Sequence, residues 1–90
     1  MRLRWRREAL DDLQRIFSFN VEKSEDFAVR VERRLLERAQ ALATTPGLGR
    51  PTDRRGVMRL SITDIQYVMD YRPSEDRVSI VRIRSTREIR

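Results

Sequence analysis

The 90-residue sequence contains neither cysteine nor histidine. Without cysteine it can form no disulfide, and it has no thiolate to act as a nucleophile or a metal ligand. Without histidine it lacks the commonest metal ligand and the usual general base at neutral pH. No apolar run approaches the ~20 residues that a membrane-spanning helix needs. We therefore expect a cytoplasmic protein that binds no metal and no cofactor and has no membrane partner.

Glycine and proline are also scarce, with three of each in the chain. Four of these six residues fall within residues 46–51, which makes residues 44–51 the clearest loop in the sequence. A chain of this length has room for one hydrophobic core, and a small core favours a partner. We expect residues 1–90 to form a single domain that works in a complex.

Charged residues, by contrast, are abundant: 20 lysines and arginines stand against 14 acidic residues, for a net charge of +6. Lys23 is the lone lysine, so nearly all of the positive charge is arginine. The planar guanidinium suits phosphate and carboxylate groups. This balance indicates a polyanionic or acidic partner, although a GC-rich genome also produces arginine in place of lysine.

The first third of the chain predicts a strand and a helix. Residues 2–6 alternate arginine with apolar residues, as in a short half-buried strand. From residue 8 the apolar spacing becomes that of an amphipathic helix, in which Asp11 and Arg15 are placed to form an ion pair. The residues expected on its inward side are Ala9, Leu13, Ile16, Phe17 and Asn20.

A second helix is predicted after a break at residues 20–24. Ser24 is well suited to cap its N-terminus, and the acidic residues that follow suit the positive end of the helix dipole. It should end before the loop at residues 44–51. Its inward residues are expected to be Phe27, Val31, Leu35, Ala39 and Leu42.

After Gly56 the pattern becomes that of β-structure, with strands predicted at residues 57–62, 65–72 and 78–84. The apolar alternation shifts between Ile80 and Val81, which indicates either a β-bulge or burial on both faces. The expected order is βααβββ. The fold class is α+β, with a helical hairpin packed on one face of a small, mostly antiparallel sheet.

Several short segments of the chain recur, in the same order, in a known protein family. They are Trp5, Ala9, Asp12-Leu13 and Ile16; Pro46 with Gly49-Arg50-Pro51; Gly56-Val57-Met58-Arg59-Leu60; Tyr67-Val68-Met69-Asp70-Tyr71; and Val78-Ser79-Ile80-Val81-Arg82-Ile83. Over nearly the whole chain the sequence thereby resembles the ParE toxins of the RelE/ParE superfamily. One position departs from the family pattern: after the last strand Arg87 matches an expected arginine, whereas the expected histidine is missing.

The resemblance implies a bacterial toxin of a type II toxin–antitoxin module, held in a hetero-oligomer by a ParD-like antitoxin. RelE-like members of the superfamily cut mRNA on the ribosome, and ParE-like members poison DNA gyrase. RNA cleavage needs a proton acceptor, a proton donor and positive charge for the phosphorane. The chain has no histidine, one lysine that is far in sequence from the sheet, and no tyrosine after Tyr71. The gyrase-directed activity is therefore favoured, and no residue is assigned as catalytic.

Two groups of residues are candidates for contacts. Target or anion binding is assigned to Arg59, Arg82, Arg84 and Arg87, with Arg59 expected beside Arg82 or Arg84 across the sheet; solvated arginines are the alternative. Antitoxin binding is assigned to Leu10, Phe17 and Leu36, since exposed apolar residues mark docking surfaces. The competing functions are the ribosome-dependent mRNA endonuclease and a basic nucleic-acid-binding domain without toxicity.

Overall fold

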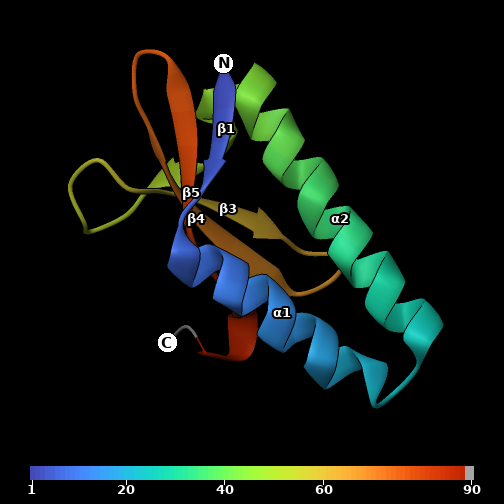
Figure 1. Ribbon diagram of the computed structural model, residues 1–90. Helices are drawn as coiled ribbons and strands as arrows, with labels where there is room; N and C mark the ends of the chain where they lie inside the picture. The colour runs from blue at the N-terminus through green and yellow to red at the C-terminus, as the bar shows by residue number, and fades with distance from the viewer. Residues whose placement is uncertain (89–90) are drawn as a thin grey trace.

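In the computed structural model, which describes residues 1–88, a helical hairpin lies on one face of a five-stranded mixed sheet (Figure 1). The elements in chain order are β1 (Arg2–Trp5), α1 (Arg7–Val21), α2 (Glu25–Thr44), the 3₁₀ turn η1 (Pro46–Leu48), β2 (Arg50–Pro51), β3 (Met58–Ile62), β4 (Tyr67–Pro73), β5 (Arg77–Ser85) and the 3₁₀ turn η2 (Thr86–Glu88). The predicted α+β class is confirmed, but the predicted loop at residues 44–51 also holds η1 and β2. Neither helix within residues 1–88 is long and apolar enough to cross a bilayer.

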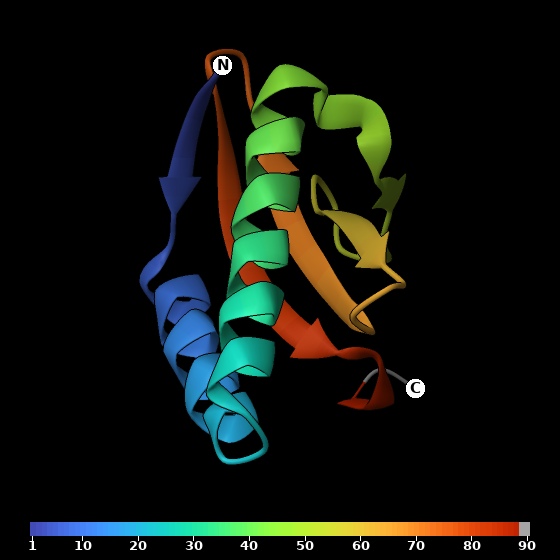
Figure 2. The same cartoon turned by 90° about the vertical axis from the view of Figure 1, so that its right-hand side faces the viewer.

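The strand order is β1-β5-β4-β3-β2, so the first and last strands of the chain are neighbours. Strand β1 runs parallel to β5, and the other pairs are antiparallel. Both helices lie on one side of this sheet, with α2 crossing in front of it (Figure 2). Within residues 1–88 the opposite face of the sheet carries no helix.

A β-bulge in β5 accounts for the shift in apolar alternation. Tyr71 lies opposite Ile80, whereas Asp70 lies opposite Arg82, so Val81 is the extra residue. A bulge of this kind bends a strand and re-aims the side chains beyond it. Consequently Ile80 and Ile83 both belong to the buried core, although they are three residues apart.

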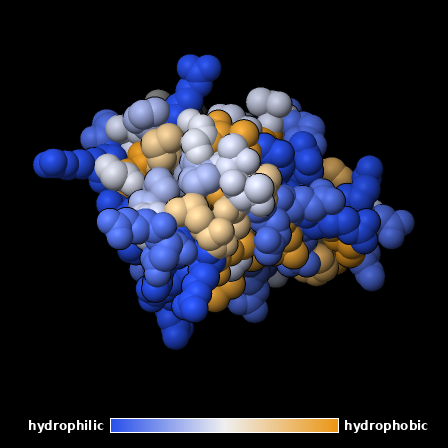
Figure 3. Space-filling view, turned by 90° about the horizontal axis from the view of Figure 1, so that it is seen from above, coloured by the Kyte–Doolittle hydropathy of each residue, from blue (hydrophilic) through white to orange (hydrophobic). Residues whose placement is uncertain are grey.

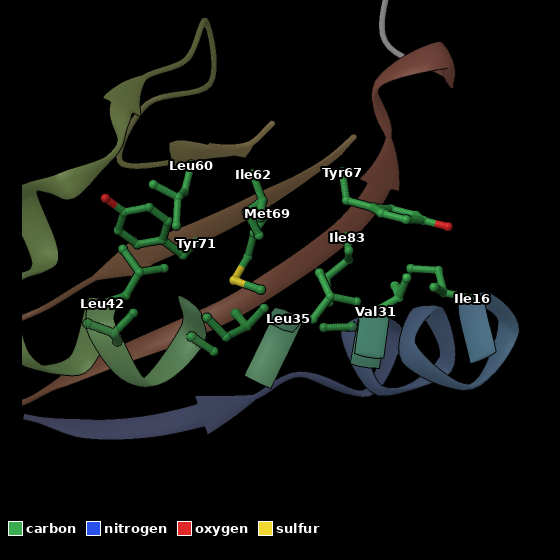
Figure 4. Close-up of a cluster of buried hydrophobic side chains, with 14 residues drawn as sticks. Ile16, Val31, Leu35, Leu42, Leu60, Ile62, Tyr67, Met69, Tyr71 and Ile83 are labelled. Atoms are coloured by element: carbon green, nitrogen blue, oxygen red, sulfur yellow. The ribbon is translucent and has the colours of Figure 1, made fainter. Parts of the chain in front are cut away.

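The core fills the space between α2 and the central strands (Figure 4). Leu35 and Leu42 of α2 are fully buried, as are Met69 and Tyr71 of β4. The prediction for Phe27 was wrong: this ring is 37% exposed, because it lies in the first turn of α2, where the helix extends past the sheet. Burial of a large aliphatic side chain stabilises the fold by about 1.5–3 kcal/mol, so α2 is held mainly by its inward stripe.

The ends of α2 are fixed by local chemistry. The hydroxyl oxygen of Ser24 accepts a hydrogen bond from the backbone N–H of Phe27 at 3.3 Å, which confirms the predicted N-cap. At the other end, Thr45 precedes Pro46 and leaves the helical conformation (φ −133°, ψ 81°), as residues before proline tend to do.

The segment after α2 is tied to the sheet by Tyr71. Its buried hydroxyl donates to the carbonyl of Pro46 at 2.6 Å and accepts from the N–H of Gly49 at 2.9 Å. Burial raises the pKa of this hydroxyl, and the hydrogen bond from Gly49 offsets only part of this increase. The tyrosine therefore stays protonated and holds η1 and β2 against the edge of β3.

Candidate functional site

Two buried carboxylates organise the arginines of the sheet, and the first is Asp12 on α1. Its Oδ2 accepts hydrogen bonds from Arg82 Nε and from the backbone N–H of Ile83, both at 2.8 Å. Its Oδ1 accepts from Arg82 Nη2 and Arg15 Nη2, both at 3.2 Å. Arg15 thus pairs with Asp12, three residues away, and the predicted pairing with Asp11 was wrong.

The position of Asp12 follows from the sheet topology. Strand β1 pairs with β5 only as far as Ile80, so the edge of β5 beyond that point has no neighbouring strand. Helix α1 begins two residues after β1 and runs along this edge. The carboxylate of Asp12 accepts the N–H of Ile83 there, where a further strand would otherwise have done so.

The protonation state of Asp12 is set by these contacts. Burial alone would favour the neutral acid, but the hydrogen bonds from Arg82, Ile83 and Arg15 outweigh it, so the pKa of Asp12 lies below its usual value. Asp12 is therefore an anion at neutral pH and a poor proton acceptor.

The second carboxylate, Asp70 on β4, lies on the sheet face opposite the two helices. Arg59 is directly opposite on β3 and donates from Nε to Oδ1 at 2.7 Å and from Nη2 to Oδ2 at 3.1 Å. Arg84 on β5 donates from Nη2 to Oδ2 at 3.1 Å. Among the described residues the buried Nε of Arg84 has no hydrogen-bond partner.

The four arginines assigned to target or anion binding are thus divided among three places. Arg59 and Arg84 meet at Asp70, as one of the two predicted arrangements required. Arg82 turns away to Asp12, across the edge of β5 that β1 leaves unpaired beyond Ile80. Arg87 is exposed, in the 3₁₀ turn η2. None of the four is a free base, and three of them are held in fixed positions.

Arg87 borders a groove of about 500 Å³ at the tip of the helical hairpin. The exposed rings of Phe19 and Phe27 form part of its walls, and the ammonium of Lys23 lies 4.8 Å from the centre of the Phe19 ring. Asn20 and Tyr67 also line the groove and are hydrogen-bonded to each other at 3.3 Å. It combines apolar walls with polar groups, as peptide-binding grooves do.

Leu10, Phe17 and Leu36, the residues assigned to antitoxin binding, all lie on the helical layer. Leu10 is 49% exposed and Leu36 is 43% exposed, while Phe17 is half-buried. Leu36 lines a second, shallower groove along α2. The large exposed hydrophobic residues of the helices and η1 are Leu10, Phe19, Val21, Phe27, Val29, Leu36 and Leu48.

Residues that sequence reasoning missed include Asp12 and Asp70 as organising carboxylates. Asp12 falls three residues after Ala9 and four before Ile16, on the buried face of α1, and a carboxylate at such a position indicates a buried ion pair. Asp70 lies between two core residues of an apolar strand. Within residues 1–88 no three acidic, histidine or cysteine residues come together as metal ligands would.

Comparison with known proteins identifies the family. The sequence pattern described as "ParE toxin of type II toxin-antitoxin system, parDE" matches residues 3–90. The curated "Putative toxin Y4kP" of Sinorhizobium fredii (strain NBRC 101917 / NGR234) is 36% identical over 75 residues, 83% of this chain and 78% of that protein. A solved structure described as "Chromosomal ParDE TA system from P. aeruginosa" aligns with a TM-score of 0.84 and 26% identity, covering 94% of this chain and 95% of its own. This chain therefore belongs to the ParE toxin family of type II toxin–antitoxin systems.

Proposed function

We propose that this toxin acts in the cytoplasm by binding and poisoning DNA gyrase, without breaking a bond itself. The observation that carries the proposal is the state of the sheet arginines: Arg59, Arg82 and Arg84 are each held on a carboxylate. Ribonucleolytic cleavage needs a group that accepts a proton. Arginine does not do so at neutral pH, and the lowered pKa of Asp12 makes it a weak base.

The test of gyrase poisoning is a supercoiling assay with purified toxin, relaxed plasmid and ATP. We expect the wild-type protein to inhibit supercoiling and to produce linear DNA. Arg87→Gln should raise the half-inhibitory concentration on the order of tenfold, the equivalent of ~1.4 kcal/mol of lost contact. Arg87 is chosen because it is exposed beside the tip groove and its side chain makes no hydrogen bond or ion pair within residues 1–88.

Arg33→Gln on the exposed side of α2 is the matched control, with the same loss of charge at a distant site. It should inhibit as the wild type does. If folded wild-type protein at large excess leaves gyrase unaffected, the gyrase proposal is wrong. Cleavage of mRNA on programmed ribosomes is then the activity to measure.

We further propose that a ParD-like antitoxin neutralises the toxin by covering the helical layer. Six large hydrophobic residues are exposed on α1 and α2, whereas such residues are normally few and scattered on a small soluble domain. Leu10 on α1 and Leu36 on α2 are among the most exposed. The neutralised complex would accordingly be a hetero-oligomer of toxin and antitoxin.

Leu36→Asp is expected to weaken the cognate antitoxin by tenfold or more, because a buried apolar contact at an interface centre contributes about 1–2 kcal/mol or more. Arg55→Gln, in the exposed loop between β2 and β3 that projects away from both helices (Figure 1), changes the net charge by the same one unit and should leave the affinity unchanged. Isothermal titration calorimetry measures both. If the antitoxin binds the two variants with equal affinity, its binding surface does not include Leu36.

A further inference from the structure

The sheet face opposite the helices carries arginine on all five strands. Leu3 and Trp5 pack on the core opposite Val78 and Ile80, and alternation therefore directs their neighbours to the other face. In β4 the side chain of Met69 faces the core, so alternation directs the residues on either side of it to the opposite face. Apart from Arg82, which pairs with Asp12, the seven arginines of this face are Arg2 and Arg4 on β1, Arg77 and Arg84 on β5, Arg72 on β4, Arg59 on β3 and Arg50 on β2.

These arginines are crowded against one another. Arg2 lies directly opposite Arg77, and Arg4 and Arg72 lie on either side of Ser79 in one row across three strands. Like charges at such distances destabilise a sheet unless an anion separates them. We call Arg2, Arg4, Arg72 and Arg77 the arginine face.

Carboxylates neutralise little of this charge. Asp70 is taken up by Arg59 and Arg84 at the far end of the sheet. Asp76 lies 3.5 Å from Arg77 and is 69% exposed. Within residues 1–88 no carboxylate forms an ion pair with the guanidinium groups of Arg2, Arg4 or Arg72. The face therefore presents a net positive charge that its own residues leave unbalanced.

The surface chemistry indicates which anion fits. Apart from Met1, every large exposed hydrophobic residue within residues 1–88 lies on the helices or η1, so the arginine face lacks the apolar centre of a protein interface. It has no exposed aromatic ring on which a single-stranded base could stack. Seen from above, hydrophilic side chains project around most of the outline of the molecule (Figure 3). A row of phosphates on a nucleic-acid duplex fits this face, because it carries negative charge and needs neither an apolar centre nor an exposed aromatic ring.

We propose that the arginine face binds the phosphate backbone of duplex DNA, irrespective of sequence. Guanidinium forks on adjacent strands can each engage a phosphate with two hydrogen bonds. This contact goes beyond the proposed action on gyrase, because the toxin itself touches DNA through residues that are not assigned to the gyrase contact.

The test compares two double variants that lose the same charge. Arg2→Gln/Arg4→Gln alters the arginine face, and Arg30→Gln/Arg33→Gln alters the exposed side of α2. Binding of the purified full chain to a fluorescent duplex of about 20 base pairs is followed by anisotropy between about 50 and 200 mM salt. In a plot of log affinity against log salt, the slope should decrease in magnitude by about two for the first variant. The second variant should keep the wild-type slope.

Circular dichroism establishes that each variant is folded, and Arg77→Gln, with an expected slope change of about one, substitutes for a misfolded double variant. Identical slopes for wild type and the arginine-face variants overturn the proposal. Tighter binding of a single-stranded RNA of the same length also overturns it. The proposal is also overturned if polyglutamate displaces the labelled duplex as completely as unlabelled duplex does, because the face would then bind acidic protein. The assay contains no gyrase, so its outcome is separate from that of the supercoiling test.

Discussion

Asp12→Ala is expected to lower the free energy of unfolding by about 3 kcal/mol. The substitution removes the acceptor for the buried N–H of Ile83 and for two guanidinium groups at once. The expected loss of stability is at the lower end of the range for breaking a fully buried ion pair. The side chains of Arg82 and Arg15 are 41% and 51% exposed, so water replaces part of the hydrogen bonding that they lose. Urea denaturation followed by circular dichroism measures the change.

Asp11→Ala is the matched control, since Asp11 is the exposed neighbour on the same helix turn. An exposed substitution of this kind should change the stability by no more than about 0.5 kcal/mol. Equal losses for the two variants would mean that the Asp12 contacts contribute nothing beyond the general effect of removing an acidic residue near the start of α1.

The lowered pKa of Asp12 also predicts how this contribution depends on pH. A carboxyl group whose pKa is lower in the folded state stabilises the fold fully above its unfolded pKa of about 3.9, and loses that contribution as the pH falls through the folded value. The difference in stability between wild type and Asp12→Asn should therefore be constant near neutrality and narrow below about pH 4. A constant difference down to the acid transition would contradict it.

The elements of the fold were predictable because their chemistry is local. Apolar spacing placed both helices and the last three strands, and Ser24 marked the start of α2 through a hydrogen bond within four residues. The shift between Ile80 and Val81 was visible in the sequence as a break in alternation, and the structure confirms a bulge there. In each case the information lies within one element of the chain.

The partners of the arginines were not predictable in this way. Arg82 pairs with a carboxylate 70 residues earlier, and this pairing depends on where β1 ends and on how far the bulge rotates β5. The exposure of Phe27 likewise depends on how far α2 extends past the sheet. Periodicity assigns a residue to a face but does not say whether another element covers that face.

Gly49→Ala is expected to destabilise the protein by about 2–3 kcal/mol through overpacking. A Cβ atom at this position would lie 2.6 Å from the carbonyl oxygen of Arg59 and 2.7 Å from the hydroxyl oxygen of Tyr71. The backbone of Gly49 is extended (φ −84°), so the cost comes from close contact and not from a left-handed conformation. Gly47→Ala, two residues earlier, meets no atom within 4 Å and should cost little. Thermal unfolding of the two variants separates these cases.

The Gly49 prediction becomes sharper when it is combined with Tyr71→Phe. Loss of the hydroxyl removes one of the three close contacts, since Tyr71 Cε1 at 2.8 Å remains, but also removes the hydrogen bonds to Pro46 and Gly49, at a cost of about 1–2 kcal/mol. Gly49→Ala should then cost about 1 kcal/mol less in the Tyr71→Phe background than in the wild type, because the two residues share one contact. Strict additivity of the two substitutions would show that Gly49 is limited by the Arg59 carbonyl and the Tyr71 ring and not by the hydroxyl. A measured coupling would instead explain the Gly49-Arg50-Pro51 segment physically: the glycine is the residue that lets the exit from α2 approach the buried tyrosine.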